Sequence, residues 1–205
     1  MAEPAQNRKY TYSDYLTWDD ENRYELIDGE VYMMSAPSLD HQEISMEISR
    51  QLANYLQGKT CKVFPAPCDV RLNADTEDDT VVQPDMIVVC DPKKIENRKS
   101  CKGAPDMVVE ILSPSTAIYD QNTKLEKYVR AGVKEYWLVN PETKSVHVYL
   151  FKNGEGIFRM YKDADVISVN ILENCQIHLA DVFPAVSSEE ETRRKESKRN
   201  TYPGS

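Results

Sequence analysis

Apolar residues recur every four positions in the stretch 41–56, at Ile44, Ile48, Leu52 and Leu56. Charged side chains fill the opposite side of this stretch, so the spacing predicts an amphipathic helix with one buried face. We expect the helix to end at Gly58, because glycine readily adopts the backbone conformation that closes helices.

A β-hairpin is predicted before this helix. Two strand-like runs, Tyr24–Ile27 and Glu30–Met33, flank the dipeptide Asp28-Gly29. A D-G pair between two such runs is the strongest short-range signal for a hairpin. The register that this turn sets places Glu25 opposite Tyr32, on the same face as Ile27.

The rest of the chain alternates between strand and helix signals. We expect strands at 63–72, 81–90, 106–112, 136–139, 145–150, 157–161 and 166–169, and helices at 11–18 and 121–131. Thr11 and Asp14 form a capping box for the first helix, Gly132 closes the second, and Pro114 breaks the strand before it. This order predicts an α/β (α+β) fold, with a central mixed β-sheet flanked by helices, an N-terminal hairpin and C-terminal hairpins.

The length of 205 residues, with 40% apolar and 29% charged residues, fits one globular domain. We expect a flexible N-terminus over 1–10, a single domain over 11–186 and a disordered charged tail over 187–205, where almost nothing could be buried. No apolar run approaches the ~20 residues that cross a bilayer, and the N-terminus carries no apolar signal-peptide stretch. The sequence therefore predicts a cytoplasmic protein.

Charge and cysteine content narrow the class of protein further. The formal charge of −9 repels nucleic acid at long range, unless a bound divalent cation reverses the sign of the charge locally. The cysteines form an odd set without a C-x-x-C pair, so we expect buried or incidental thiols rather than disulfides or a zinc site. These cysteines are Cys61, Cys68, Cys90, Cys101 and Cys175.

Two carboxylates interrupt the most apolar strand signals, Asp85 within 81–90 and Glu110 within 106–112. A buried, unpaired carboxylate costs several kcal/mol, so each requires hydrogen bonds, a cation or a metal. If the strands are neighbours, both side chains point to one spot, where two carboxylates and a carbonyl oxygen suit Mg²⁺. The alternative is structural: Asp85 bonds a backbone amide at an edge strand marked by Pro84, and Glu110 pairs with an arginine or lysine.

Several stretches resemble the Uma-type restriction endonuclease family, within the PD-(D/E)XK nuclease superfamily. They are Tyr24–Met33, V-V-Q-P-D at 81–85, V-V-E-I-L-S-P-S-T at 108–116, and A-G-V-K-E-Y-W-L-V at 131–139. The likeness runs from Thr11 to Pro184 and implies a restriction endonuclease-like core. Pro84-Asp85 and Glu110 match the acidic elements of the superfamily pattern.

The third position of the (D/E)-x-K pattern is Leu112 here, where the superfamily carries lysine. The resemblance implies a lysine moved to the following helix, and Lys124 is the candidate. Tyr128 lies one turn away on the same helix face, whereas Lys127 faces away and serves as an internal control. The alternative for Lys124 is an ordinary solvated helix lysine.

Glu25 and His41 also match the family pattern. Glu25 is a possible extra metal ligand or base, and the alternative is a glutamate paired with a basic neighbour. His41 lies on the apolar face of its helix, where a hydrogen-bonded core or capping histidine is the more common case.

The combined hypothesis is a metal-dependent endonuclease that hydrolyses phosphodiester bonds of nucleic acid, with DNA as the expected substrate. Asp85, Glu110 and the Ile111 carbonyl would hold Mg²⁺ or Mn²⁺, and Lys124 would act as a base or as an electrostatic stabiliser. The resemblance also implies a homodimer. The alternatives are a catalytically inactive nuclease-like module that binds nucleic acid or protein, and a phosphodiesterase for a smaller substrate. The sequence contains no Gly-rich phosphate loop, G-x-S-x-G or H-E-x-x-H motif.

Overall fold

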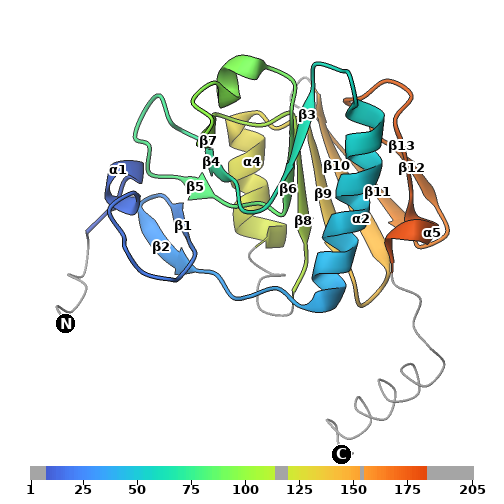
Figure 1. The fold of residues 1–205 in the computed structure, drawn as a ribbon, viewed down its shortest axis with the longest axis horizontal. Coiled ribbons are helices and arrows are strands. Elements are labelled where there is room, and N and C mark those ends of the chain that lie inside the picture. Colours follow the sequence, from blue (N-terminus) through green and yellow to red (C-terminus); the bar gives the residue numbers. More distant parts are fainter. Residues whose placement is uncertain (1–7, 114–119, 153–154, 184–205) are drawn as a thin grey trace, which may run out of the picture.

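The computed structural model describes residues 8–113, 120–152 and 155–183, and within them the strands form one six-stranded, one five-stranded and one two-stranded sheet (Figure 1). In spatial order the largest sheet contains β11 (Glu155–Lys162), β10 (Ser145–Lys152), β9 (Glu135–Asn140), β8 (Met107–Ile111), β6 (Met86–Val89) and β3 (Lys62–Pro65). The second contains β2 (Glu30–Met33), β1 (Tyr24–Ile27), β5 (Val81–Val82), β4 (Asp69–Arg71) and β7 (Ser100–Lys102). The smallest pairs β12 (Val166–Ser168) with β13 (Gln176–His178).

The helices are α1 (Tyr12–Tyr15), α2 (Leu39–Leu56), α4 (Leu125–Ala131) and α5 (Leu179–Val182), with a 3₁₀ turn η1 (Pro92–Ile95) and a π-helical turn η2 (Asp120–Lys124). β8 and β9 run parallel, whereas β6 and β8 run antiparallel. The largest sheet is therefore mixed, as predicted, and the α/β (α+β) class is confirmed.

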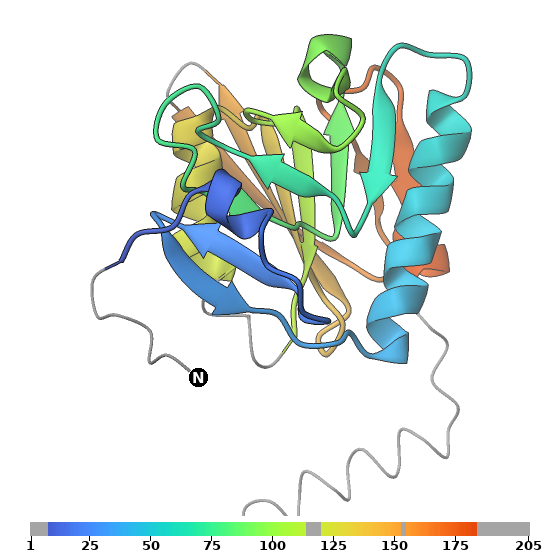
Figure 2. The ribbon, with the colours of Figure 1, turned by 60° about the vertical axis from the view of Figure 1, so that its left-hand side comes forward.

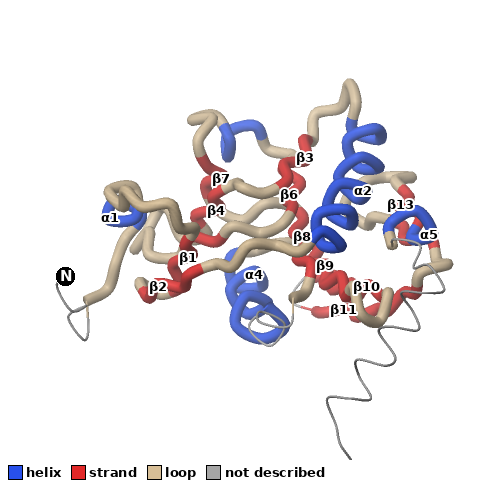
Figure 3. The backbone as a smooth tube through the Cα atoms, turned by 60° about the horizontal axis from the view of Figure 1, so that its bottom comes forward, coloured by secondary structure: helices blue, strands red, loops and turns tan. Residues whose placement is uncertain are grey.

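Two helices cover opposite faces of the six-stranded sheet (Figure 3). The apolar face of α2, including Ile48 and Leu52, packs with Met86 and Val109 in one core cluster. Tyr128 of α4 belongs to a second cluster on the other face, which the five-stranded sheet also shares. Strand alternation places successive residues of β6 and β8 in different clusters, so the central strands are buried on both faces.

The predictions of one long strand at 63–72 and another at 81–90 are wrong. Each is divided into two short strands that belong to different sheets: β3 and β4 in the first case, β5 and β6 in the second. Prolines explain both breaks, because Pro67 and Pro84 have no N–H to continue a ladder. Pro84 consequently marks a crossover between sheets rather than an edge strand.

The local helix and turn predictions are confirmed with shifted limits. α2 starts at Leu39, and the Oγ of Ser38 accepts the His41 backbone N–H at 3.2 Å. The first helix keeps its predicted capping box but ends at Tyr15. The second begins as the η2 turn, and Gly132 closes it with φ +93°. The elements β7, β13, η1 and α5 were not predicted.

Two of the five cysteines form a disulfide, which corrects the expectation of thiols throughout. Cys61 and Cys90 are bonded, and their Cα atoms are 3.9 Å apart. The register of β3 against β6 pairs Lys62 with Val89, so the next residues along face each other across the ladder. Cys68, Cys101 and Cys175 are free thiols, as expected.

Some predictions fall outside the described residues. These are the tail over 187–205, most of the predicted flexible N-terminus, and the strand break at Pro114. Within residues 8–113, 120–152 and 155–183, no helix has the length and apolar character that a membrane span requires.

The hairpin turn brings two segments of backbone into close contact. Asp28 and Gly29 have φ values of +52° and +78°, and the register pairs Glu25 with Tyr32 as predicted. A Cβ added to Gly29 would lie 2.8 Å from the Cβ and 3.1 Å from the Cα of Lys9. The turn therefore requires glycine for its backbone conformation and for space.

We predict that Gly29→Ala lowers the free energy of unfolding more than Gly58→Ala does. Both positions have positive φ, which costs a non-glycine residue about 1–3 kcal/mol, but Gly58 has nothing within 4 Å of an added Cβ. Urea denaturation of both variants measures the difference. Equal losses of unfolding free energy in the two variants would show that the close approach of an added Cβ to Lys9 does not destabilise the fold.

Candidate functional site

The two predicted carboxylates lie next to the same terminal pair of the ladder between β6 and β8. Met86 pairs with Val109 at the end of this antiparallel ladder; Asp85 directly precedes β6, and Glu110 directly follows Val109 in β8. Asp85 contacts His41 of α2, whereas Glu110 contacts Lys124 of η2 and Tyr128 of α4. That both carboxylates point to one spot therefore stays a prediction.

Asp85 is held by one backbone and one side-chain contact. Its Oδ2 accepts the Ile111 backbone N–H at 2.7 Å and lies 3.1 Å from Nε2 of His41. When the carboxyl group is ionised it can only accept, and Nε2 of His41 is then the donor of this contact. His41 therefore contributes in two ways: its backbone N–H is capped by Ser38, and its ring orients Asp85.

Lys124 lies at the centre of a buried group of carboxylates. Its Nζ is 2.8 Å from Oε1 of Glu25, 3.1 Å from Oε1 of Glu110 and 3.4 Å from Oδ1 of Asp120. All four side chains are at most 5% exposed. The alternative of a solvated helix lysine is therefore wrong, and Glu25 and Glu110 both have the cationic neighbour that their structural interpretations required.

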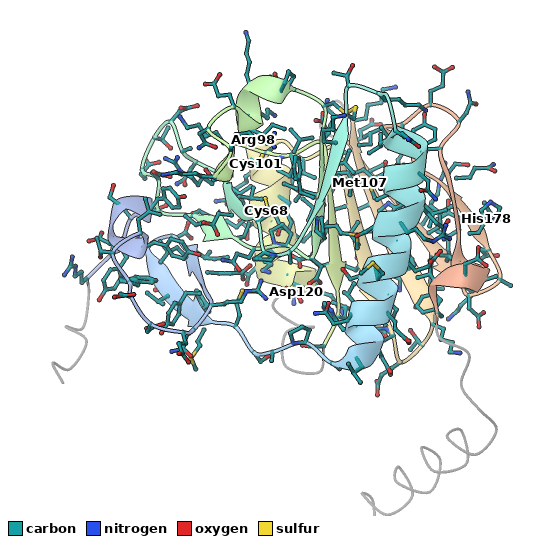
Figure 4. The ribbon with its side chains drawn as sticks, viewed as in Figure 1. Cys68, Arg98, Cys101, Met107, Asp120 and His178 are labelled. Atoms are coloured by element: carbon teal, nitrogen blue, oxygen red, sulfur yellow. A yellow bond between two sulfur atoms is a disulfide. The ribbon has the colours of Figure 1, made fainter. Side chains whose placement is uncertain are left out.

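Separate elements supply the members of this cluster, which we call the Lys124 cluster (Lys124, Glu25, Glu110 and Asp120). Glu25 comes from β1, Glu110 from β8, and Asp120 and Lys124 from the two ends of η2. Figure 2 shows the β1–β2 hairpin beside α4, and Figure 4 labels Asp120 at the lower end of that helix. Helical turns with π geometry occur frequently at functional sites.

Neighbouring groups fix the carboxylates of the cluster. The Tyr128 hydroxyl donates to Oε1 of Glu110 at 2.7 Å, so Lys124 and Tyr128 do share one helix face. The Gln83 backbone N–H donates to Oε1 of Glu25 at 2.7 Å. The Tyr136 hydroxyl donates to the Asp120 carbonyl at 3.0 Å.

Burial and mutual repulsion determine the protonation of the cluster. Burial raises the pKa of Glu110 well above its usual value; Lys124 opposes this rise, while Asp120, Asp85 and Glu25 add to it. Burial alone would lower the pKa of Lys124, but Glu110, Glu25 and Asp120 raise it well above its usual value. Lys124 is therefore an ammonium at neutral pH.

Sequence reasoning did not select Asp120, Gln83 or Tyr136 as site residues. The four-residue spacing of Asp120 and Lys124 is the one signal that could have indicated the first, because residues i and i+4 lie on one side of a helix. Gln83 and Tyr136 lie within the family motifs at 81–85 and 131–139, but neither residue type by itself indicates a site. Their roles depend on a crossover between sheets and on the packing of β9 under η2.

Lys127 lies outside the Lys124 cluster, as predicted, but it has a structural role. Its Nζ is 2.6 Å from both carboxylate oxygens of Asp28 at the hairpin tip. This ion pair joins the hairpin that carries Glu25 to α4. Arg130, which pairs with Glu126 on the exposed side of the same helix, is therefore a cleaner control than Lys127.

The donor set suits a hard divalent cation. Within the described part of the chain, the hydrogen bonds to Asp85 and Glu110 use Oδ2 and Oε1, so Oδ1 and Oε2 could serve as ligands for a cation. No group of three or more His, Cys, Asp or Glu side chains forms a metal site among these residues. Mg²⁺ binds through one or two carboxylates with water in the remaining positions, so two carboxylates are sufficient.

We predict that Lys124→Met lowers the free energy of unfolding by about 3–5 kcal/mol at neutral pH, because it leaves buried carboxylates without their cation. The pKa of Glu110 is already raised, and a carboxyl with a raised pKa in the folded state loses stability as pH increases through that pKa. The loss of unfolding free energy caused by Lys124→Met should therefore be smaller at acidic pH than at neutral pH. Urea denaturation of the variant and the unaltered protein at both pH values measures this loss.

The matched control for this prediction is Arg130→Met. Its partner Glu126 is mostly exposed, and exposed pairs contribute ~0–1 kcal/mol. If Arg130→Met and Lys124→Met cost the same at neutral pH, the Lys124 cluster does not stabilise the fold in this way.

Comparison with known proteins identifies the family. The family model described as "Putative restriction endonuclease" (Uma2) matches residues 12–180. A Synechocystis protein, slr1290, described as uncharacterized, is 33% identical over 153 residues, which are 72% of this chain and 77% of that protein. A second Synechocystis protein, sll1609, likewise described as uncharacterized, is 26% identical over 144 residues, or 68% of this chain and 80% of that protein.

A solved structure shows the same fold. It is described as a putative nuclease belonging to DUF820 from Anabaena variabilis, and it superposes with a TM-score of 0.69 at 19% identity. The match covers 85% of this chain and 97% of that chain. The resemblance drawn from the sequence motifs is thereby confirmed: the chain belongs to the Uma2 family of putative restriction endonucleases.

Proposed function

We propose that this protein is a divalent-metal-dependent endonuclease that hydrolyses phosphodiester bonds in DNA. The observation that carries the proposal is that Asp85 and Glu110 adjoin the same terminal pair of the β6–β8 ladder, Met86 with Val109, and that the Lys124 ammonium is bonded to Glu110. Membership of a nuclease family supports the class of reaction. We further propose that the protein acts as a homodimer.

Asp85, Glu110 and the Ile111 carbonyl would hold Mg²⁺ or Mn²⁺. A cation bound there lowers the pKa of a coordinated water and neutralises charge on the phosphate oxygens. The protein supplies the geometry: the Ile111 N–H and His41 fix one carboxylate, and Tyr128 fixes the other. Carboxylates held in this way need not reorient when negative charge develops on the phosphate in the transition state.

Lys124 acts as an electrostatic stabiliser in this proposal rather than as a base. The pKa of Lys124 is raised by its carboxylate neighbours, so the amine keeps its proton at neutral pH. Three carboxylates restrain its position from different directions. A fixed ammonium can orient the attacking water and stabilise the negative charge of the transition state. Glu25 and Asp120 are positioning residues, because they contact Lys124.

We predict that Asp85→Asn and Glu110→Gln each reduce Mg²⁺- or Mn²⁺-dependent cleavage of supercoiled plasmid by about 100-fold or more, as expected when a group that stabilises the transition state is lost. Lys124→Met should reduce turnover more than metal affinity. Glu126→Gln, on the exposed side of α4, is the matched carboxylate control and should cleave normally. Cleavage by the Asp85 and Glu110 variants at the unaltered rate would refute the assignment.

Calorimetry with Mn²⁺ separates this function from a nuclease-like module that only binds nucleic acid or protein. An enzyme with this site should bind Mn²⁺, and Asp85→Asn should weaken that binding. A binding module has no chemical requirement for metal at these residues. Absence of Mn²⁺ binding by the intact protein would favour the module.

A further inference from the structure

Strand β11 is an open edge of the six-stranded sheet (Figure 3). All eight of its residues pair in unbroken register with β10, so the strand contains no bulge. Among the described residues β10 is its one ladder partner, so on its other side β11 has no ladder partner within this part of the chain. Natural proteins usually protect such edges with prolines, bulges or central lysines.

β11 carries charged residues at both ends and Arg159 near its centre, but it also exposes three large apolar side chains. Ile157, Phe158 and Met160 are 47%, 53% and 56% exposed. Phe158 contacts the rings of His147 and Tyr149 on β10, with centroid distances of 5.4 and 5.2 Å. Phe158 and Met160 therefore lie on one sheet face beside the rings of Tyr149 and His147, whereas Ile157 lies on the other face. Exposed apolar edges of this kind pair with another strand.

The charges at the two ends of β11 are complementary in one orientation. The strand begins with Glu155 and ends with Lys162. Antiparallel pairing of two copies brings the Glu155 end of one strand to the Lys162 end of the other, twice by symmetry. Parallel pairing would place like charges together. A second copy of this chain would therefore cover the apolar side chains of β11 and pair its terminal charges.

We propose that two copies of this protein associate through antiparallel pairing of their β11 strands, which joins their six-stranded sheets. This assigns the surface of the homodimer proposed above. In that arrangement β8 of one copy and β8 of the other are seven strand spacings apart, or on the order of 34 Å at ~4.8 Å per spacing. Each candidate site therefore stays complete within its own subunit.

Sedimentation velocity of the full chain at micromolar concentration tests the interface. The intact protein should sediment with twice the chain mass of 23.5 kDa. Met160→Asp should raise the dimer dissociation constant about tenfold or more, because it places a charge at the centre of the paired surface. Met33→Asp is the matched control, since Met33 is 71% exposed on β2, the edge strand of the other sheet.

A charge exchange tests the orientation. Lys162→Glu should weaken the dimer, and adding Glu155→Lys should restore it, because the two positions meet only between copies. Within one chain Lys162 pairs with Ser145 and Glu155 with Lys152, so circular dichroism melting must show that each variant is folded. Amide hydrogen exchange over 155–162 should slow as protein concentration increases.

A monomeric intact protein would overturn the proposal, as would a dimer that survives Met160→Asp or is broken by Met33→Asp. Failure of the charge exchange to restore association would overturn the antiparallel orientation. Plasmid nicking per chain should be unchanged in Met160→Asp, because each site is complete in one subunit. Mass and cleavage are measured separately, so this proposal and the nuclease assignment can fail independently.

Discussion

The ion pairs of the Lys124 ammonium with three buried carboxylates are the interactions on which the rest of the structure depends. An ammonium and three carboxylates are removed from water here, and such groups are stable in an interior only when they are paired and hydrogen-bonded. Because Glu25, Glu110 and Asp120 come from different parts of the chain, the pairing requires β1, β8 and η2 to meet. The two sheets and α4 are therefore joined at the same point where the candidate chemistry lies.

Apolar packing around this cluster strengthens its electrostatics. Tyr128 and Tyr136 are fully buried with ring centroids 5.0 Å apart, and their hydroxyls bond Glu110 and the Asp120 carbonyl. Interactions between charges are stronger where water is excluded. The aromatic side chains thus exclude water with their rings and satisfy the polar groups with their hydroxyls. The same residues serve the core and the site.

The parts of the site that depend on local pattern could be predicted from the sequence. Asp85 and Glu110 stand out because each interrupts an apolar run, and strand alternation gives their direction. The crossover at Pro84 could not be placed, because a short apolar run has the same pattern in either sheet. Asp120 and the Cys61–Cys90 bond depend on contacts between distant elements. Composition and periodicity do not encode such pairings directly, whereas family motifs led to Lys124.

The effect of the negative net charge on nucleic-acid binding depends on where the acidic side chains lie. Four of the acidic side chains lie at the candidate site: Asp85 beside His41, and Glu25, Glu110 and Asp120 around the Lys124 ammonium. A divalent cation held by Asp85 and Glu110 would offset negative charge at these side chains. Part of the acidic character that opposes nucleic acid at long range therefore lies where a metal would offset it. Charge location, rather than total charge, decides whether a phosphate can approach.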